Sequence, residues 1–314
     1  MQSAARQVSH RARAWWLTPA PATRLGLLRI AIGAFALAQL GYETPSLLAV
    51  LDFLPRQFEP VGLATWLAQP LGAGALYGWL GACFALGVSF TLGLGYAFTA
   101  PGFALSLLAL TTYRSSWGMV LHTDNLLTLH VALLALAPAA AALSIDARRG
   151  RARGAAPPDE PHGRFGWPLR ALSIVTVTCY VLAGVAKLEL AGFAWLGGDL
   201  LRAQIAYDNL RKLELGAPIV PLGPWLVRHA SIFPALAVVT LLVELGAPLA
   251  LLGKRWATVW CLAAWGFHLG VLLTMSIGFT YQLSGLPYLA FFAVERFGLT
   301  RRFVTFLERS RSIS

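Results

Sequence analysis

The stretch LRALSIVTVTCYVLAGVAKLELA, residues 169–191, is the part of the sequence that decides the fold. Residues 171–186 carry no charged side chain, and an α-helix of about 20 apolar residues crosses the hydrocarbon core of a bilayer. Similar apolar runs recur along the chain, so the sequence predicts an all-α, polytopic membrane helical bundle. About eight transmembrane helices are expected, at residues 23–41, 72–97, 101–114, 125–143, 169–191, 232–252, 256–276 and 283–295.

The composition leaves little charge for a water-exposed surface. Hydrophobic residues make up 57% of the 314 residues and charged residues 12%, whereas a soluble domain carries roughly 25% charged residues. A soluble chain of this length would need a charged surface over each of its cores, so lipid has to replace water around most of the helices. The net charge of +11 lies largely between the apolar runs, which is typical of membrane topology and not of nucleic-acid binding.

The positions of arginine and lysine predict the topology. With eight spans, one side of the membrane receives the basic segments 1–22, 144–168, 253–255 and 296–314. Because basic loops stay in the cytoplasm, both termini are expected there. The basic, proline-containing loop 144–168 is expected to hold no packed element. Residues 198–213 are expected to form an amphipathic helix at the surface.

Ionisable side chains inside a span are candidate functional residues, because their burial in lipid is costly. Tyr180, Gly184 and Lys187 follow at i, i+4 and i+7, so they share one face of a helix. Gly184 leaves room beside the Lys187 amine for a ligand or another helix. A lysine in apolar surroundings can lose its proton and act as a base. The alternative interpretation is a lysine that extends to the outer interface.

Further polar residues lie in or beside other predicted spans. Glu244 and His268 lie mid-span and could pair, either as a structural hydrogen bond or within a functional site. His122 and Asp124 precede the span 125–143 at the outer surface, where Lys187 is also expected, although Asp124 also suits a helix N-cap.

Common catalytic and nucleotide-binding motifs do not occur in the sequence. It has no clustered cysteines, no GxGxxG or P-loop, and no HExxH or GxSxG motif. We therefore expect no metal site, no nucleotide-driven transport and no common hydrolase.

The segment YVLAGVAKL, residues 180–188, resembles the Tyr-x-x-Ala-Gly-x-x-Lys-Leu segment of the vitamin K-dependent γ-carboxylase family. That family includes bacterial relatives, the HTTM (horizontally transferred transmembrane) proteins, so the resemblance implies that the chain is located in the bacterial inner (cytoplasmic) membrane. Shorter stretches that are also similar to the family are Leu28-Arg29-Ile-Ala-Ile-Gly33, His122-Thr-Asp-Asn, Ser144-Ile-Asp146, Trp195-Leu-Gly-Gly-Asp199, Glu244 and His268-Leu-Gly. The resemblance covers roughly residues 15–295, the expected transmembrane domain, and leaves 1–14 and 296–314 as basic cytoplasmic tails.

The resemblance implies a quinol-dependent carboxylase, a carbon–carbon lyase. Lys187 would be the base that deprotonates a reduced quinone, such as vitamin K hydroquinone or menaquinol, with O2 and CO2 as co-substrates and no metal. His122 is the second catalytic residue that the resemblance implies. The residues expected to line the site are Tyr180, Gly184, Asp124, Glu244 and His268.

The expected partners are the lipid bilayer and an exported peptide or protein, docked by the loop 192–231 or by another protein. No nucleic acid is expected. Relatives that help to mature secreted peptides imply an alternative, a non-catalytic maturation or immunity partner of such a peptide. A small-molecule transporter is a third hypothesis, although no paired interruption of two spans is visible.

Overall fold

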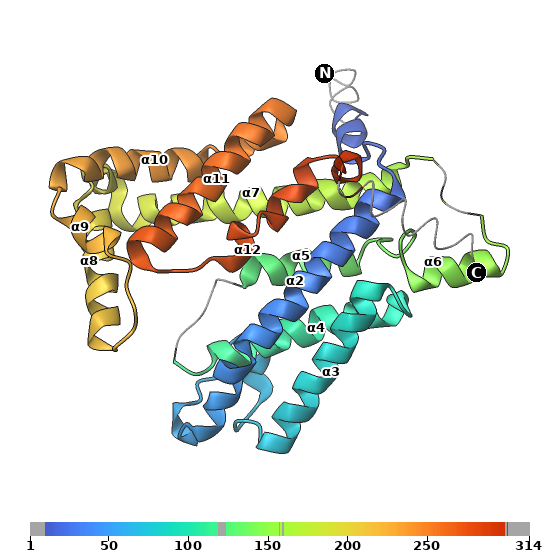
Figure 1. The fold of residues 1–314 in the computed structure, drawn as a ribbon, viewed down its shortest axis with the longest axis horizontal. Coiled ribbons are helices and arrows are strands. Elements are labelled where there is room, and N and C mark those ends of the chain that lie inside the picture. The colour runs from blue at the N-terminus through green and yellow to red at the C-terminus, as the bar shows by residue number, and fades with distance from the viewer. Residues whose placement is uncertain (1–9, 119–123, 157, 159, 299, 301–314) are drawn as a thin grey trace, which may run out of the picture. The chain divides into compact units, whose positions relative to one another are not determined.

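The computed structural model describes residues 10–118, 124–156, 158, 160–298 and 300, and these residues form helices joined by turns, with no β-sheet among them (Figure 1). The predicted all-α fold is therefore confirmed. Five helical segments in this part of the chain are long and apolar enough to cross a membrane. They are Ala22–Asp52, Ala73–Leu92, Gly163–Gly197, Ala230–Leu251 and Lys254–Met275.

The chain divides into two compact units. Unit 1 comprises Met1–Leu172 and Ala293–Ser314, and unit 2 comprises Ser173–Phe292. The helices of unit 1 are α2 (Ala22–Leu48), α3 (Ala73–Leu92), α4 (Tyr96–Ser115), α5 (Asn125–Ala135), α6 (Ile145–Ala152) and the start of α7 (Gly163–Ala191). Those of unit 2 are the rest of α7, α8 (Asp199–Glu214), α9 (Leu222–Val227), α10 (Phe233–Leu245), α11 (Lys254–Met275) and α12 (Thr280–Leu283). Short 3₁₀ turns connect them.

Several predicted boundaries were wrong for identifiable reasons. The apolar run 125–143 is helical only to Ala135, and Pro138 stands in the turn that follows. The run 283–295 is not one helix. After α12 it consists of the short 3₁₀ helices Leu286–Phe291 and Val294–Arg296, because Gly285 adopts a left-handed conformation and Pro287 interrupts the hydrogen bonding. The eighth predicted span therefore lacks a continuous helix.

The basic loop 144–168 is not wholly irregular, because it contains the short helix α6, although none of the residues of that helix is buried. Ser144 accepts a hydrogen bond from the Ala147 N–H and caps α6. The Asp146 carboxylate accepts hydrogen bonds from the backbone N–H groups of Gly95 and Tyr96, at 2.9 and 2.8 Å. The positive end of the α4 helix dipole also stabilises a carboxylate at this position. The polar sequence 144–146 is thus a folded connection within unit 1.

Arg29 is the largest fully buried side chain of unit 1. From α2 it donates to the carbonyl oxygens of Ala139 and Leu143 at 2.8 and 2.5 Å, and its guanidinium lies 5.9 Å from the centre of the Tyr96 ring. These carbonyl groups belong to the turn after α5, where no following helical turn provides backbone N–H donors for them. The planar fork of arginine can serve several carbonyls at once, so one buried cation fixes this turn.

Unit 2 has its core between the second half of α7, α10 and α11. The buried cluster includes Val177, Tyr180, Val243, Trp260 and Tyr288. The Trp260 indole N–H donates to the Val243 carbonyl at 2.9 Å, and its ring packs edge-on against Tyr180. An aromatic side chain with its polar atom satisfied is suited to such a core. This packing fixes which face of α7 points inward.

Candidate functional site

Lys187 lies on α7 and forms an ion pair with Glu244 of α10. The Lys187 Nζ donates to Glu244 Oε1 at 2.5 Å, and the ammonium lies 5.5 Å from the centre of the Trp195 ring. Glu244 is only 2% exposed, whereas the lysine side chain keeps about a quarter of its surface. The expectation of purely apolar surroundings for Lys187 is corrected here, because its nearest charged group is a buried carboxylate.

Gly184 allows α7 and α10 to approach beside this pair. A methyl group added at Gly184 would lie 2.8 Å from Leu245 Cδ2 and 3.1 Å from Glu244 Cβ. Those distances leave no space for a side chain, so the glycine permits direct helix contact. The predicted face of Tyr180, Gly184 and Lys187 does point toward α10 and α11, but the room at Gly184 is occupied by α10.

We expect Gly184→Ala to destabilise unit 2 by about 1 kcal/mol, because the added methyl group separates α7 from α10. Thermal unfolding in detergent would report the change. Gly270→Ala is the matched control, since Gly270 is also helical and has nothing within 4 Å of an added methyl group. That control is expected to be neutral or stabilising. Equal effects at the two positions would contradict the close approach at Gly184.

Tyr180 joins a second polar network on the same helix face. Its hydroxyl lies 2.6 Å from the Tyr288 hydroxyl and 2.8 Å from His268 Nε2, and all three residues are buried. Glu244 and His268 therefore do not pair with each other, as had been considered from the sequence. They lie on neighbouring helices, but one binds Lys187 and the other binds Tyr180.

Two atoms of these networks have unused hydrogen-bonding capacity. Glu244 Oε2 and His268 Nδ1 are both buried and have no hydrogen-bond partner among the residues that the structure describes. A buried polar atom without a partner is costly, at roughly 1–3 kcal/mol. The unused carboxylate oxygen of Glu244 belongs to the same side chain that holds Lys187, so this pair can accept a further donor.

Asp124 belongs to a separate polar cluster in unit 1. Its carboxylate accepts from Arg114 at 3.2 Å and from Gln39 at 3.3 Å, and Arg114 also binds Glu43. These four side chains line a pocket whose walls include Leu40, Leu107, Leu110 and Leu127. His122 lies outside the described residues. Because Lys187 belongs to unit 2, the predicted gathering of His122, Asp124 and Lys187 stays a prediction.

The Asp124 carboxyl group gives unit 1 an expected pH dependence. Burial and the neighbouring Glu43 raise the pKa of Asp124 to about 7, although Arg114 and Gln39 oppose the shift. The folded pKa is above the unfolded value near 4, so the folded state binds more protons between those values. The stabilisation is present below pH 4 and is lost as the pH rises through about 7. Unfolding of the wild type followed from pH 5 to pH 8 should show this decline.

Asp124→Asn is expected to flatten the decline between pH 5 and pH 8, because an amide can still bond its neighbours but cannot lose a proton. Glu59→Gln is the control, because the Glu59 side chain is exposed, and it should leave the dependence of stability on pH as in the wild type. An Asp124→Asn profile as steep as that of the wild type would show that another group titrates.

The sequence reasoning missed several partners of the candidate residues. Tyr288 lies in the apolar run 283–295, which was predicted to be a span, so it was not considered as a site residue. Its side chain is buried in the core of unit 2. Glu43 follows the predicted span 23–41 and Arg114 ends the predicted span 101–114, and neither was among the expected site residues, yet Arg114 binds both Glu43 and Asp124. Their shared position at predicted outer helix ends was the one available signal.

The apolar helices and the ionisable groups buried between them define a multi-pass integral membrane protein. A sequence model of the HTTM domain matches residues 17–295, nearly the whole chain, and the protein belongs to the HTTM domain family. It is thereby a membrane protein related to the γ-carboxylase family. No curated protein and no solved structure matches the chain.

Proposed function

We propose that unit 2 carries the acid–base centre of a quinol-dependent modification of an exported peptide, of the carboxylation type. The observation that carries the proposal is the Lys187–Glu244 pair, in which Nζ and Oε1 are 2.5 Å apart and the second carboxylate oxygen is buried without a partner among the described residues. An ionisable pair in a membrane span is a functional hypothesis by default. Here the pair also has capacity for a third group.

The pair can supply a base without leaving a net charge behind. At 2.5 Å a proton can move from Lys187 Nζ to Glu244 Oε1, which converts the ion pair into a neutral amine and a neutral carboxyl group. Both forms have zero net charge, so the burial that penalises isolated ions does not oppose the exchange. The free amine of Lys187 can then take a proton from a substrate hydroxyl group, and the side chain returns to its ammonium form.

A quinol hydroxyl is the donor that we propose for the unused oxygen of Glu244. A phenolic hydroxyl is a hydrogen-bond donor, and Glu244 Oε2 is a buried acceptor that lacks a donor among the described residues. The quinol, with oxygen, would supply the reducing power and the strong base that the carboxylation of a glutamate side chain by CO2 requires. Glu244 would hold the hydroxyl group, and Lys187 would receive its proton.

Trp195 would limit the position of the lysine. Its ring is almost fully buried, and its indole N–H donates to Thr240 Oγ1 at 3.3 Å, so the ring is fixed against α10. The Lys187 ammonium lies over the ring, and a cation there is attracted by the negative ring face. The lysine is thus restrained on one side by an aromatic ring and on the other by a carboxylate.

The test is quinol turnover by the purified chain in nanodiscs. Vitamin K hydroquinone or menaquinol is added with oxygen, and the oxidised quinone and its epoxide are measured by mass spectrometry. We expect turnover by the wild type and a loss of at least about 100-fold in Lys187→Met, the usual scale for removing a general base. Lys254→Met is the matched control, because Lys254 is also a lysine of unit 2 but is exposed at the start of α11.

The second candidate function is a non-catalytic maturation or immunity partner of a secreted peptide. The ion pair itself favours it, since a lysine held by a carboxylate can be purely structural. Lys187→Arg distinguishes the two functions, because arginine keeps the charge but does not lose its proton in proteins. Full peptide-linked function in the Lys187→Arg variant, beside a wild type that turns over no quinol, would support this second candidate over the first.

A further inference from the structure

Helix α8 exposes several large apolar side chains and buries the polar residues Asp208 and Asn209 beside Ile205, while Gln204 and Glu214 are also exposed. The side chains of Leu200, Tyr207, Leu210 and Leu213 are 41–69% exposed. Leu200, Tyr207 and Leu210 recur at helical spacing on one face, with Leu213 at its edge. A surface helix in water shows the opposite arrangement, with its apolar stripe toward the protein.

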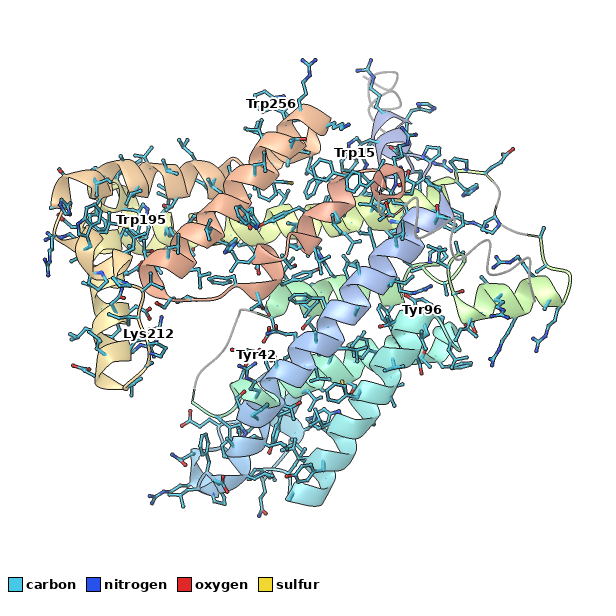
Figure 2. The ribbon with its side chains drawn as sticks, viewed as in Figure 1. Trp15, Tyr42, Tyr96, Trp195, Lys212 and Trp256 are labelled. Carbon is cyan, nitrogen blue, oxygen red and sulfur yellow. The ribbon has the colours of Figure 1, made fainter. Side chains whose placement is uncertain are left out.

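The inward polar residues of α8 satisfy the end of α11. Asn209 donates to the Thr274 carbonyl at 2.7 Å, and the ammonium of Lys212, which Figure 2 labels on α8, donates to the Met275 carbonyl. Asp208 is buried and binds Lys212 at 2.5 Å. The last carbonyls of a helix have no intrahelical partners, so these contacts replace water there. Pairing of these backbone carbonyls within the protein suits an environment poor in water.

The direction of α8 differs from that of the spans in its own unit. Figure 1 shows α8 running across the direction of α10 and of the end of α7. Leu190 and Phe193, where α7 ends, are 89% and 85% exposed, so large apolar side chains are also exposed at this end of α7. Trp225 on the adjacent α9 is also exposed, and tryptophan is enriched at the headgroup level of a bilayer.

We infer that α8 is an in-plane helix at the boundary between lipid headgroups and acyl chains, with its Leu200–Tyr207–Leu210 face in lipid. The small area of this face favours contact with lipid over contact with a second copy of the chain. A face of 16 residues is roughly 24 Å long and about 10 Å wide. A stable interface with a second copy needs about 800 Å² on each partner, several times more than this face offers.

The inference also sets the depth of Lys187. Lys187 lies four residues before the end of α7 at Ala191, which corresponds to about 6 Å along the helix. The Lys187–Glu244 pair is then placed about one helical turn below the boundary that α8 marks. An amphipathic ligand with its polar group at the headgroups would reach that depth from the bilayer. The position of α8 does not depend on whether Lys187 acts as a base.

Depth measurement with single labels tests the inference. In a chain with Cys83, Cys179 and Cys261 replaced by alanine, one cysteine is introduced as Tyr207→Cys or Leu210→Cys and labelled with the fluorophore NBD in nanodiscs. Val259→Cys is the lipid control, since Val259 is exposed on the span α11, and Arg153→Cys, in an exposed loop of unit 1, is the aqueous control. Quenching is measured with iodide and with lipids that carry a nitroxide at carbon 5 or carbon 12.

We expect the labels at 207 and 210 to be quenched by the nitroxide lipids as strongly as the label at 259, and more by carbon 5 than by carbon 12. Iodide should quench them at least threefold less than the label at 153. Strong iodide quenching without lipid quenching would overturn the inference. If the labels at 207 and 210 are protected from both quenchers, and the protection disappears in nanodiscs that hold a single copy, then a second copy covers this face of α8 and the inference is wrong.

A measurement on the unmodified chain guards against variants that do not fold. Lipids with a photoactivated carbene group should label the peptide that contains residues 200–215 as heavily as the peptide from α11. Absence of that labelling from the wild type, with α11 labelled, would contradict an α8 in lipid.

Discussion

Lys187→Met is expected to destabilise unit 2 by about 3 kcal/mol, because it leaves the buried Glu244 carboxylate without its cation. Removing one partner of a buried pair costs more than removing both. The double variant Lys187→Met with Glu244→Leu should therefore recover most of the lost stability, since two apolar side chains fill the space without a charge to compensate. Reversible unfolding in mixed micelles, with the denaturing detergent as the variable, measures both differences.

Lys254→Met provides the control for loss of a lysine, because Lys254 is exposed at the start of α11 and its removal leaves no buried charge. It should unfold with the wild type. If the single Lys187 variant is as stable as the wild type, or if the double variant is no more stable than the single one, then the pair does not carry a buried charge in the folded protein.

Arg29→Met is expected to cost unit 1 about 3 kcal/mol or more. The carbonyl oxygens of Ala139 and Leu143 would lose their donors inside the protein, and each such loss costs roughly 1–3 kcal/mol. Arg29→Lys should recover only part of this, because an ammonium cannot reach both carbonyls with the geometry of a guanidinium. Thermal unfolding of the two variants in detergent, followed by intrinsic fluorescence, measures the loss.

Arg148→Met is the control for Arg29, since Arg148 is exposed on α6 in the same unit and its loss should leave the unfolding temperature unchanged. A fully stable Arg29→Met variant would mean that the turn after α5 does not depend on the buried cation.

The long apolar runs of the sequence sufficed to predict most of the helices. Runs such as 169–191 and 256–276 allow little besides a membrane helix, because an unpaired backbone is excluded from lipid. Short runs with proline were misread. Pro138 and Pro287 fall inside apolar stretches, where hydropathy stays high although the hydrogen bonding of the helix stops.

The candidate residues could be found from the sequence, but their pairing could not. A lysine and a glutamate within spans are conspicuous, so Lys187 and Glu244 were identified individually. Which helix each one faces depends on the rotation of α7 against α10, and this is set by the close contact at Gly184 and by the packing of Trp260. Periodicity places Tyr180 and Lys187 on one face but does not specify what meets that face.

The most direct measurement is quinol turnover by the folded double variant Lys187→Met with Glu244→Leu in nanodiscs, beside the wild type and the Lys254→Met control. Because the double variant is expected to keep the fold, a loss of activity cannot be attributed to unfolding. The account predicts oxidised quinone and its epoxide from the wild type and the control, and at least about 100-fold less from the double variant. Wild-type turnover by a folded double variant would contradict the assignment of Lys187 and Glu244 as the acid–base centre.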